Sequence, residues 1–233
     1  MKNLHDYHYP AANPSLLAAD KSRIKEEILF AEECGARFIH IDVMDGKFVP
    51  AISLSLQFVK DYAHVHHMVN DVHLMIEEPW KYVRDYAEAG ADIVTFHYEA
   101  CPNAEKIEET IKNIVLGGAN VGISIKPNTP VSVLKPYLTK VNLILLMSVE
   151  PGKGGQKFMM ESLKRLDDIR DLFKEIKPVD RPILEIDGGI NENSAKLASD
   201  NGAEILVAGS YLYGHDDFKA RLQFLENSEG EKR

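Results

Sequence analysis

Histidine and aspartate side chains near the ends of three short apolar runs are the residues best suited to chemistry in this chain. His40 and Asp42 lie two positions apart in one run, His73 lies in another, and Asp187 follows a third. Side chains alternate between the two faces of a β-strand, so His40 and Asp42 share one face. Imidazole and carboxylate groups are ligands of Zn²⁺, Fe²⁺, Mn²⁺ and Co²⁺. If the three runs end at one place, the four residues predict a site for one divalent metal ion.

Each of these residues also has an ordinary structural explanation when it is taken alone. A single inward histidine is more often a hydrogen-bonded core residue, and a single aspartate at the end of a strand often caps the next helix. Asp45, just beyond its run, is typical of such a turn residue. Four candidates from three runs are harder to explain in this way, which favours the metal site.

Glycines gather after three neighbouring apolar runs in the last third of the chain. With two accompanying polar residues, the set comprises Gly152, Lys153, Gly154, Gly155, Gly188, Gly189, Gly209 and Ser210. Glycine has no Cβ, so the backbone amides of such loops can approach an anion closely. Three tight turns are the alternative explanation. Because the glycines fall in three consecutive loops, they predict a site for the phosphate group of a small molecule.

Short apolar runs and longer amphipathic segments alternate along the chain, and these elements must position the site. The runs predict eight strands, at residues 13–17, 38–43, 71–75, 93–98, 121–125, 143–149, 183–186 and 205–208. The segments between them predict helices that include residues 22–34, 80–89, 104–116, 162–176 and 193–200. Strands and helices in alternation indicate a parallel sheet with right-handed crossovers.

A closed barrel and a large open sheet both agree with this alternation. No glycine-rich loop of the dinucleotide-binding type follows the first run, and polar residues lie at the ends of many runs. This distribution is typical of a (β/α)8 TIM barrel, whose active site forms at the carboxyl ends of several strands. We therefore predict an α/β protein with a single barrel domain over residues 1–233. Residues 1–10 and 228–233 are predicted to be flexible tails.

Local residue patterns predict where some of these helices begin and end. Asn193 is a candidate N-cap, and Ser162 opens a helical segment. Gly35, Gly90 and Gly202 each follow a helical segment at the position that favours a left-handed residue.

The bulk composition limits the possible partners. The chain has 233 residues, a formal net charge of −9 and two isolated cysteines, Cys34 and Cys101. An acidic chain is not expected to bind nucleic acid, and isolated cysteines indicate a reducing compartment. The longest apolar stretch, residues 143–147, is far shorter than the ~20 residues of a membrane-spanning helix. We therefore predict a cytoplasmic protein with a small-molecule substrate and neither a nucleic-acid nor a membrane partner.

Taken together, the motifs resemble those of the ribulose-phosphate 3-epimerase family over nearly the whole chain. The most specific segment is 40–50, which reads His-Ile-Asp-Val-Met-Asp-Gly-Lys-Phe-Val-Pro. Further matching segments follow in the family's order at residues 13–20, 73–75, 127–130, 147–152, 154–156, 187–189 and 209–210.

The resemblance implies a metal-dependent enzyme that inverts C3 of a ketose phosphate, with D-ribulose 5-phosphate and D-xylulose 5-phosphate as the expected pair. His40, Asp42, His73 and Asp187 would bind the metal. Zinc is the first choice, and iron(II), manganese and cobalt are alternatives. Asp42 would accept the proton and Asp187 would donate one on the opposite face, through an enediolate whose charge the metal stabilises.

The resemblance also implies the residues that hold the substrate. Ser15 and His73 would contact the sugar, and the three glycine loops would hold the phosphate. Met44, Met75 and Met147 would line the cavity, although plain core filling is an equal alternative for them. A homo-oligomer is also expected, although no motif in the sequence specifies one.

Three departures from the family pattern lie near the predicted mouth of the barrel. Residues 51–55 lack the usual Asn and Gly, Ala18 replaces a common Ser, and Lys153 stands where an aromatic residue is usual. The substrate is therefore less defined than the reaction type. Lys153 either adds a charge near the phosphate or is a solvated loop residue.

Three other functions stay open on the sequence. An epimerase for another ketose phosphate, such as D-allulose 6-phosphate, would use the same residues with a roomier mouth. A phosphate-binding decarboxylase or aldolase would need a catalytic lysine, for which Lys47 and Lys126 are the candidates. A non-catalytic sugar-phosphate sensor would be expected to have lost the acids or the metal ligands, and all four are present.

Overall fold

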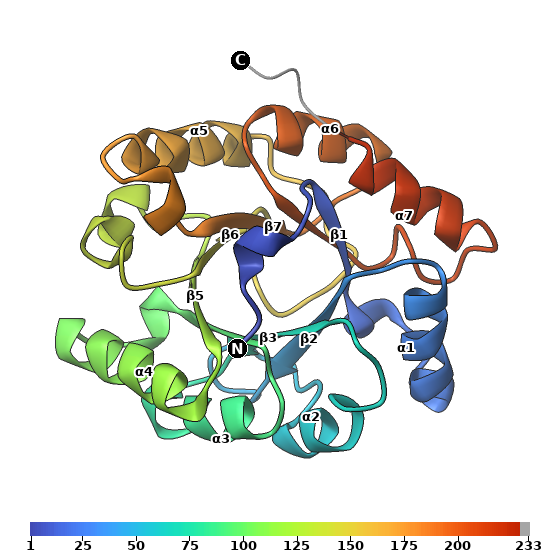
Figure 1. The fold of residues 1–233 in the computed structure, drawn as a ribbon, viewed down its shortest axis with the longest axis horizontal. Helices are drawn as coiled ribbons and strands as arrows, with labels where there is room; N and C mark the ends of the chain where they lie inside the picture. Colours follow the sequence, from blue (N-terminus) through green and yellow to red (C-terminus); the bar gives the residue numbers. More distant parts are fainter. Residues whose placement is uncertain (229–233) are drawn as a thin grey trace.

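Eight parallel strands surround a central axis in the computed structural model of the chain, which describes residues 1–228 (Figure 1). Seven neighbouring pairs form ladders, and the bridge between Ser15 and His40 brings the first strand beside the second. The strands are β1 (Ala11–Pro14), β2 (Phe38–Met44), β3 (Val69–Met75), β4 (Ile93–His97), β5 (Asn120–Ile125), β6 (Leu143–Met147), β7 (Ile183–Asp187) and β8 (Ile205–Ala208). The prediction of a (β/α)8 barrel is confirmed.

The first strand shows the largest difference between the predicted and observed strands. It was predicted at residues 13–17, and in the structure it ends at Pro14. Ser15 then caps a short 3-10 helix, because its side chain accepts a hydrogen bond from the backbone N–H of Leu17. The chain therefore turns out of the barrel one residue after the strand, and Ser15 stays at the mouth.

Helices cover the outside of the ring of strands (Figure 1). The α-helices are α1 (Ile24–Glu33), α2 (Leu56–Tyr62), α3 (Val83–Glu88), α4 (Ala104–Gly117), α5 (Glu161–Phe173), α6 (Glu192–Asp200) and α7 (Phe218–Glu226). The 3-10 helices are η1 (Leu4–Asp6), η2 (Leu16–Ala18), η3 (Lys21–Arg23), η4 (Pro79–Lys81), η5 (Tyr98–Ala100), η6 (Val131–Tyr137) and η7 (Pro178–Asp180). Between β5 and β6 the connection is η6 rather than an α-helix, and it contains Pro136, which has no N–H to donate.

The structure confirms some of the predicted helix ends and corrects another. Gly35, Gly90 and Gly202 follow α1, α3 and α6 with φ values of 103°, 113° and 98°, the left-handed region that glycine adopts readily. The prediction that Asn193 caps a helix was wrong. Asn191 is the cap of α6, because its side chain accepts the N–H groups of residues 193 and 194 in a capping box with Ser194.

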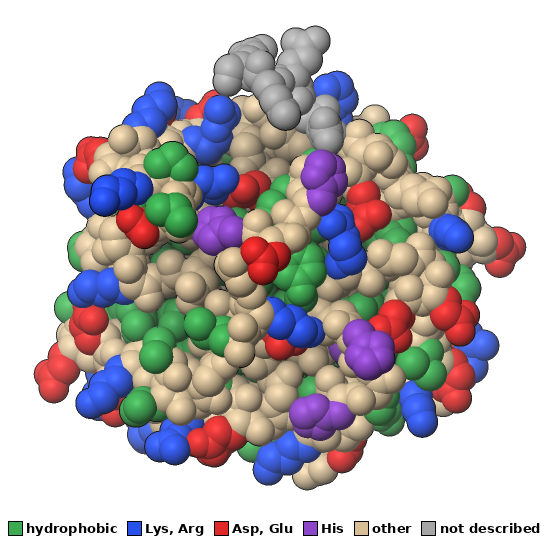
Figure 2. Space-filling model, viewed as in Figure 1, with side chains coloured by type: hydrophobic (Ala, Val, Ile, Leu, Met, Phe, Trp, Pro, Cys, Tyr) green, Lys and Arg blue, Asp and Glu red, His purple; other side chains and the backbone are tan. Residues whose placement is uncertain are grey.

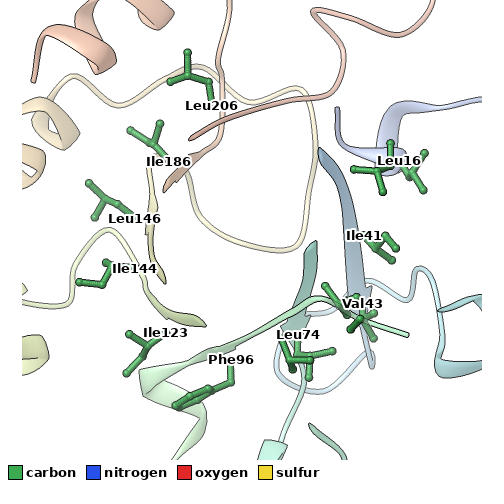
Figure 3. Packing of buried hydrophobic residues seen from close by; sticks show 14 of the residues in the cluster. Leu16, Ile41, Val43, Leu74, Phe96, Ile123, Ile144, Leu146, Ile186 and Leu206 are labelled. Atoms are coloured by element: carbon green, nitrogen blue, oxygen red, sulfur yellow. The ribbon is translucent and has the colours of Figure 1, made fainter. Parts of the chain in front are cut away.

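The main apolar core lies between the outer face of the barrel and the helices. Alternate residues of each strand point outward into it, and Figure 3 shows this for Ile41, Leu74, Ile123, Ile144 and Leu206, among others. Each of these five side chains is at most 1% exposed. The helices are therefore held to the barrel by burial of apolar surface.

The inward faces of the strands change from apolar to polar toward the carboxyl ends. Successive inward residues are Ala11 and Asn13 from β1, with Ser15 directly after it; Phe38, His40, Asp42 and Met44 from β2; Val69, Asp71, His73 and Met75 from β3; and Ile183, Glu185 and Asp187 from β7. Ala11, Phe38, Val69 and Ile183 close the barrel floor together with Ile93, Leu143 and Ile205. Met44 and Met75 lie at the opposite end, beside the cavity. Two layers of polar side chains lie above this floor, and they form the site.

Residues 1–10 pack against the barrel, so the prediction of a flexible tail there does not agree with the structure. Leu4 is 3% exposed and belongs to the floor cluster. The Lys2 ammonium group donates to the backbone oxygen of Met68 at 2.8 Å and to the Asp92 carboxylate at 3.0 Å. In Figure 1 this segment crosses the middle of the ring. A lone leucine among polar residues carries no periodicity, which is why the sequence pattern missed this packing.

The predicted carboxyl-terminal tail falls mostly on residues 229–233, which lie outside the described residues. Ser228 itself is buried, and its hydroxyl donates to the Leu225 carbonyl at 2.6 Å. Within residues 1–228, no helix combines the length and the apolar character needed to span a membrane. On the face seen in Figure 2, acidic and basic side chains are interspersed.

Replacement of Leu4 tests whether residues 1–10 stabilise the barrel. We expect Leu4→Ala to lower the free energy of unfolding by about 2–4 kcal/mol, because it leaves a cavity against the floor. The matched change His5→Ala, at an exposed neighbour, should stay within about 0.5 kcal/mol of wild type. Urea denaturation followed by circular dichroism measures both, and equal effects would contradict the packing role.

Candidate active site

The four predicted metal ligands meet at the carboxyl ends of three strands. His40 and Asp42 come from β2, His73 from β3 and Asp187 from β7. One ligand atom from each lies within 4.8 Å of all the others. Asp42 and His73 are direct register partners across the β2–β3 ladder, which fixes their side chains on the same side of the sheet.

The Asp42 carboxylate lies at the centre of this group. Its Oδ1 atom is 3.3 Å from His40 Nε2 and 3.2 Å from His73 Nδ1. Its Oδ2 atom accepts a hydrogen bond from the Ser15 hydroxyl at 2.8 Å. The side chains of Asp42, His40 and His73 are almost fully buried. Ser15, which sequence reasoning assigned to the sugar, therefore lies against the central carboxylate.

The spacing of these atoms suits a metal ion. Neighbouring ligands of a tetrahedral site with bonds of about 2.0–2.1 Å stand roughly 3.4 Å apart, close to the 3.3 and 3.2 Å observed here. His40 Nε2 is buried and has no hydrogen-bond partner among the described residues. A buried nitrogen without a partner is costly, and a cation beside it would satisfy it. Two imidazoles and two carboxylates therefore fit one divalent ion.

A second group of acids lies on the far side of the His40 ring. The carboxylate of Asp71 lies 2.5 Å from His40 Nδ1. The side-chain amide of Asn13 donates to Asp71 and to Glu185, both at 2.8 Å. Burial and the nearby Asp71 carboxylate raise the pKa of Glu185. The Asp71 contact at Nδ1 orients the His40 ring with its Nε2 atom toward Asp42.

The His73 ring is also held from behind. Its Nε2 atom lies 2.9 Å from Nε2 of His97, the last residue of β4. His97 Nδ1 in turn lies 3.3 Å from the Glu99 carboxylate. Burial opposes ionisation of Glu99, but hydrogen bonds from His97 and Thr129 dominate and lower its pKa to about 2.

The two aspartates of the site differ in their electrostatic surroundings. Burial opposes the charge of Asp42, yet its neighbours His40 and His73 lower its pKa well below the usual range. Burial, followed by the Asp42 carboxylate, raises the pKa of Asp187 to about 6. Paired acids whose environments push their pKa values apart are typical of a base and an acid at one reacting centre.

A cavity of about 330 Å³ opens above these acids, within the roughly 300–1,000 Å³ of small-molecule sites. Asp42 and Asp187 lie on its lining together with Ser15. The rest of the predicted substrate site lines it as well, namely Gly152, Lys153, Gly154, Gly155, Gly188, Gly189, Gly209 and Ser210. Met44, Met75 and Met147 supply apolar wall. His40 and His73 stand behind this lining, where they contact Asp42.

The glycine loops are shaped by close backbone contacts. Gly189 has a φ of 64°, and a Cβ there would lie 2.3 Å from the backbone nitrogen of Phe158. The Ser148 hydroxyl lies 2.8 Å from the Asp187 carbonyl and 2.6 Å from that of Gly188, which ties the loops after β6 and β7 together. Only glycine fits this approach, so Gly189 lets the loops after β6 and β7 pack closely beside the cavity.

The two lysine candidates for decarboxylase or aldolase chemistry lie away from this cavity. Lys47 is exposed in the turn after β2. Asp45 builds that turn, because its carboxylate accepts the backbone N–H groups of Lys47 and Phe48. Lys126 Nζ lies 3.9 Å from the centre of the Phe48 ring. Within the described residues, neither lysine is part of the cavity lining.

Sequence reasoning missed the residues that support the ligands. Asn13, Asp71 and Glu185 each lie on a strand two positions before a recognised site residue. The alternation that identified His40 and Asp42 would have found them as well. His97 carries the same signal at the end of β4, whereas Glu99 lies in the following 3-10 helix and has no such signature.

Fold and site together define a TIM-barrel enzyme with paired acids, a candidate metal centre and a glycine-rich rim. The sequence profile of the ribulose-phosphate 3-epimerase family matches residues 11–213. The chain belongs to this family.

Individual relatives agree with this assignment. The chain is similar to the ribulose-phosphate 3-epimerase of Bacillus subtilis, with 41% identity over 92% of this chain and 97% of the relative. It is 40% identical to the Synechocystis enzyme of the same name over 92% of each chain. The chloroplastic ribulose-5-phosphate-3-epimerase of Arabidopsis thaliana is 38% identical over 93% of this chain and 76% of its own length.

Solved structures extend the likeness at the level of the fold. A 3-keto-L-gulonate-6-phosphate decarboxylase from Vibrio cholerae matches with a TM-score of 0.69 at 16% identity, over 94% of this chain and 97% of its own. A 3-hexulose-6-phosphate synthase matches with a TM-score of 0.64 at 18% identity, over 94% and 98%. At such low identity these matches show the shared barrel alone.

The raised pKa of Asp187 predicts a pH dependence of stability in protein freed of metal by a chelator. The carboxyl group of an aspartate has a pKa of about 4 in the unfolded chain. In the folded protein, the pKa of Asp187 is raised to about 6. The fold therefore loses stability as the pH rises from about 4 through about 6, because Asp187 must ionise in place. Asp187→Asn should remove this loss, so that the variant is more stable than wild type at pH 7.5 but not at pH 4. Urea denaturation at both pH values measures the difference, and parallel profiles would contradict it.

Proposed function

We propose that this protein catalyses the metal-dependent C3 epimerisation of D-ribulose 5-phosphate to D-xylulose 5-phosphate. The observation that carries the proposal is the Asp42 and Asp187 pair, whose oxygens lie within 4.8 Å at the base of the cavity. The relatives named ribulose-phosphate 3-epimerase support the choice of substrate.

Asp42 is suited to take the proton from C3. A C–H group beside a carbonyl is acidic enough to be removed by a positioned base, which leaves an enediolate. The Ser15 hydroxyl donates to its carboxylate and holds it in place. A cation held between Asp42, His40 and His73 would favour its charged form.

Asp187 is suited to return a proton from the opposite face. Its pKa of about 6 lets it hold a proton at the pH of the cell for part of the time. It extends from β7, which is separated from β2 by β1 and β8 around the ring. A substrate carbon placed between the two acids would therefore meet them from different sides.

His40, Asp42, His73 and Asp187 would hold the divalent metal ion, with zinc as the first choice and iron(II), manganese or cobalt as alternatives. When bound, the cation supplies positive charge that stabilises the negative charge developing on the substrate oxygens. The chain's own residues then orient the sugar, exclude water and move the proton. Met44, Met75 and Met147 contribute the apolar wall that keeps water from the reacting carbon.

The phosphate group would bind at the three glycine loops. Backbone amides at Gly152 to Gly155, at Gly188 and Gly189, and at Gly209 and Ser210 rim one side of the cavity. Amides without a neighbouring Cβ can approach the phosphate oxygens closely. The predicted homo-oligomer and the predicted cytoplasmic location stay predictions.

Isotope exchange at C3 tests the roles of the two acids. In D₂O, wild-type enzyme should incorporate deuterium into both epimers while it interconverts them. Asp187→Asn should lower turnover by about 10²- to 10⁴-fold and still exchange C3 of ribulose 5-phosphate through Asp42. Asp42→Asn should show the reverse preference and exchange xylulose 5-phosphate alone. Proton NMR follows both exchanges.

Metal analysis of each variant is the control for this experiment, because both aspartates are also proposed ligands. Turnover should disappear after chelation and return with Zn²⁺, Fe²⁺, Mn²⁺ or Co²⁺. Faster turnover of D-allulose 6-phosphate by the same preparation would replace the proposed substrate. Exchange of both epimers by both variants would contradict the two-acid scheme.

Lys153 offers a separate test of the phosphate site. Its side chain is exposed and belongs to the loop that lines the cavity. We expect Lys153→Ala to raise KM about 2- to 5-fold at low ionic strength with kcat unchanged, because an exposed charge contributes up to about 1 kcal/mol. The effect should fade in high salt, since exposed charges are screened. A KM that stays at the wild-type value at both ionic strengths would identify a solvated loop lysine.

A further inference from the structure

Behind His73 lie a buried histidine, His97, and a half-buried glutamate, Glu99, which have no role in the proposed reaction. The three side chains nevertheless form a continuous series of contacts. His73 Nε2 lies 2.9 Å from His97 Nε2, and His97 Nδ1 lies 3.3 Å from Glu99 Oε2. Both rings are 0% exposed, and their centroids are 5.0 Å apart. Neither His97 nor Glu99 lines the cavity within the described residues. They therefore act on the site through His73.

The Glu99 end of this chain has a fixed hydrogen-bond polarity. Its Oε1 atom accepts the backbone N–H of Lys126 at 2.7 Å and the hydroxyl of Thr129. A backbone N–H can only donate, so the carboxylate is an acceptor at this oxygen. Although burial opposes its charge, hydrogen bonds lower the pKa of Glu99 to about 2, so the carboxyl is ionised and its second oxygen, Oε2, is an acceptor as well. This oxygen faces His97 Nδ1. The proton of this contact therefore belongs to His97.

The count of protons then decides the state of the middle contact. A neutral imidazole carries one proton, and in His97 that proton is on Nδ1. His97 Nε2 is left with a lone pair, so it accepts, and His73 must donate through its own Nε2. The single proton of His73 is used in this way. His73 Nδ1 is left as a lone pair 3.2 Å from the Asp42 carboxylate.

Two neutral rings thus supply two protons for three contacts, and the contact without a proton is the one between His73 Nδ1 and Asp42 Oδ1. A lone pair facing a carboxylate oxygen is repulsive unless a cation stands beside both atoms. This is the position of the proposed metal centre. The hydrogen-bond direction that Glu99 fixes therefore leaves His73 Nδ1 free to bind a cation beside Asp42.

We propose that Glu99 and His97 are positioning residues that hold His73 in the tautomer whose Nδ1 atom binds the metal. The inference rests on the proposed function, because it needs His73 as a metal ligand. On the other histidine ligand, the Asp71 carboxylate contacts His40 Nδ1 directly at 2.5 Å. The two histidines thus receive the same control, one from an adjacent carboxylate and the other through a second ring.

Metal affinity measured by competition with a chromophoric chelator tests the inference without use of the reaction. With Zn²⁺ or Co²⁺ as the probe, His97→Leu should raise Kd about 10- to 100-fold, the usual effect of losing such a partner. His97→Gln should stay within about 3-fold of wild type, because its amide oxygen can accept the His73 proton at the same place.

Glu99→Gln gives the sharpest prediction, because it changes the polarity rather than the shape. With the amide oxygen on the Lys126 N–H, the new NH₂ group faces His97 Nδ1 and reverses both donors. Kd should rise about 10-fold, more than for His97→Gln, although Glu99 is farther from the metal. Nitrogen-15 NMR of the zinc-loaded proteins should show the proton of His97 on Nδ1 in wild type and on Nε2 in this variant.

Two controls separate the possible failures. His66→Leu replaces another buried histidine and should leave Kd unchanged, whereas His40→Ala should abolish tight binding. If wild-type protein binds neither metal, or if His40→Ala binds as wild type does, the proposed metal centre is wrong and the inference falls with it. If wild type binds metal but Glu99→Gln and His97→Leu bind equally well, or His97→Gln is as weak as His97→Leu, only the tautomer role is overturned.

Discussion

The burial of the Asp42 carboxylate is the constraint on which the rest of the site depends. Its residue is 3% exposed, and a charge in such a place is very costly unless it is paired and hydrogen-bonded. Its partners come from three neighbouring strands: Ser15 after β1, His40 within β2 and His73 within β3. The register of these strands is therefore tied to the electrostatics of a single side chain.

Each partner of Asp42 has a second polar atom that also needs a partner, and this requirement extends the network through the barrel. His40 Nδ1 contacts the Asp71 carboxylate, and Asp71 accepts a hydrogen bond from the Asn13 amide. His73 contacts His97, and His97 contacts Glu99. This series of contacts ends where Glu99 accepts hydrogen bonds from a backbone N–H and a hydroxyl of the loop after β5. The inner barrel is therefore a hydrogen-bonded scaffold over an apolar floor. Side chains held in this way keep one geometry, which catalysis and metal binding require.

The sequence predicts the parts of this arrangement that have a period. Apolar runs identified all eight strands, and alternation placed His40 and Asp42 on one inward face. No periodic pattern of residues signals the packing of Leu4 on the floor, because its cluster consists of residues far along the chain, such as Phe38. Glu99 was missed for a related reason: its role depends on the fold of η5, which brings it back toward β4 and the loop after β5.

The error at Asn193 shows a different limit. Two asparagines stand two positions apart, and both are good caps by residue type. The capping box with Ser194 selects Asn191, and the Ser194 hydroxyl also donates to the Gly189 carbonyl at 2.9 Å. The start of α6 is thus set by the loop that rims the cavity. Local preference could not decide this, because the deciding contact belongs to the site.

The barrel alone does not choose the chemistry, since proteins named as a synthase and a decarboxylase share it at 16–18% identity. Inversion of a carbon needs two groups that reach it from different sides. Around the ring, β1 and β8 separate β7 from β2, yet the carboxyl ends of these strands converge until their acids are within 4.8 Å. This closeness has an electrostatic consequence: burial and then the Asp42 carboxylate raise the pKa of Asp187 to about 6. The negative charge with which Asp42 can act as a base therefore also favours the protonated form of Asp187, the proposed donor.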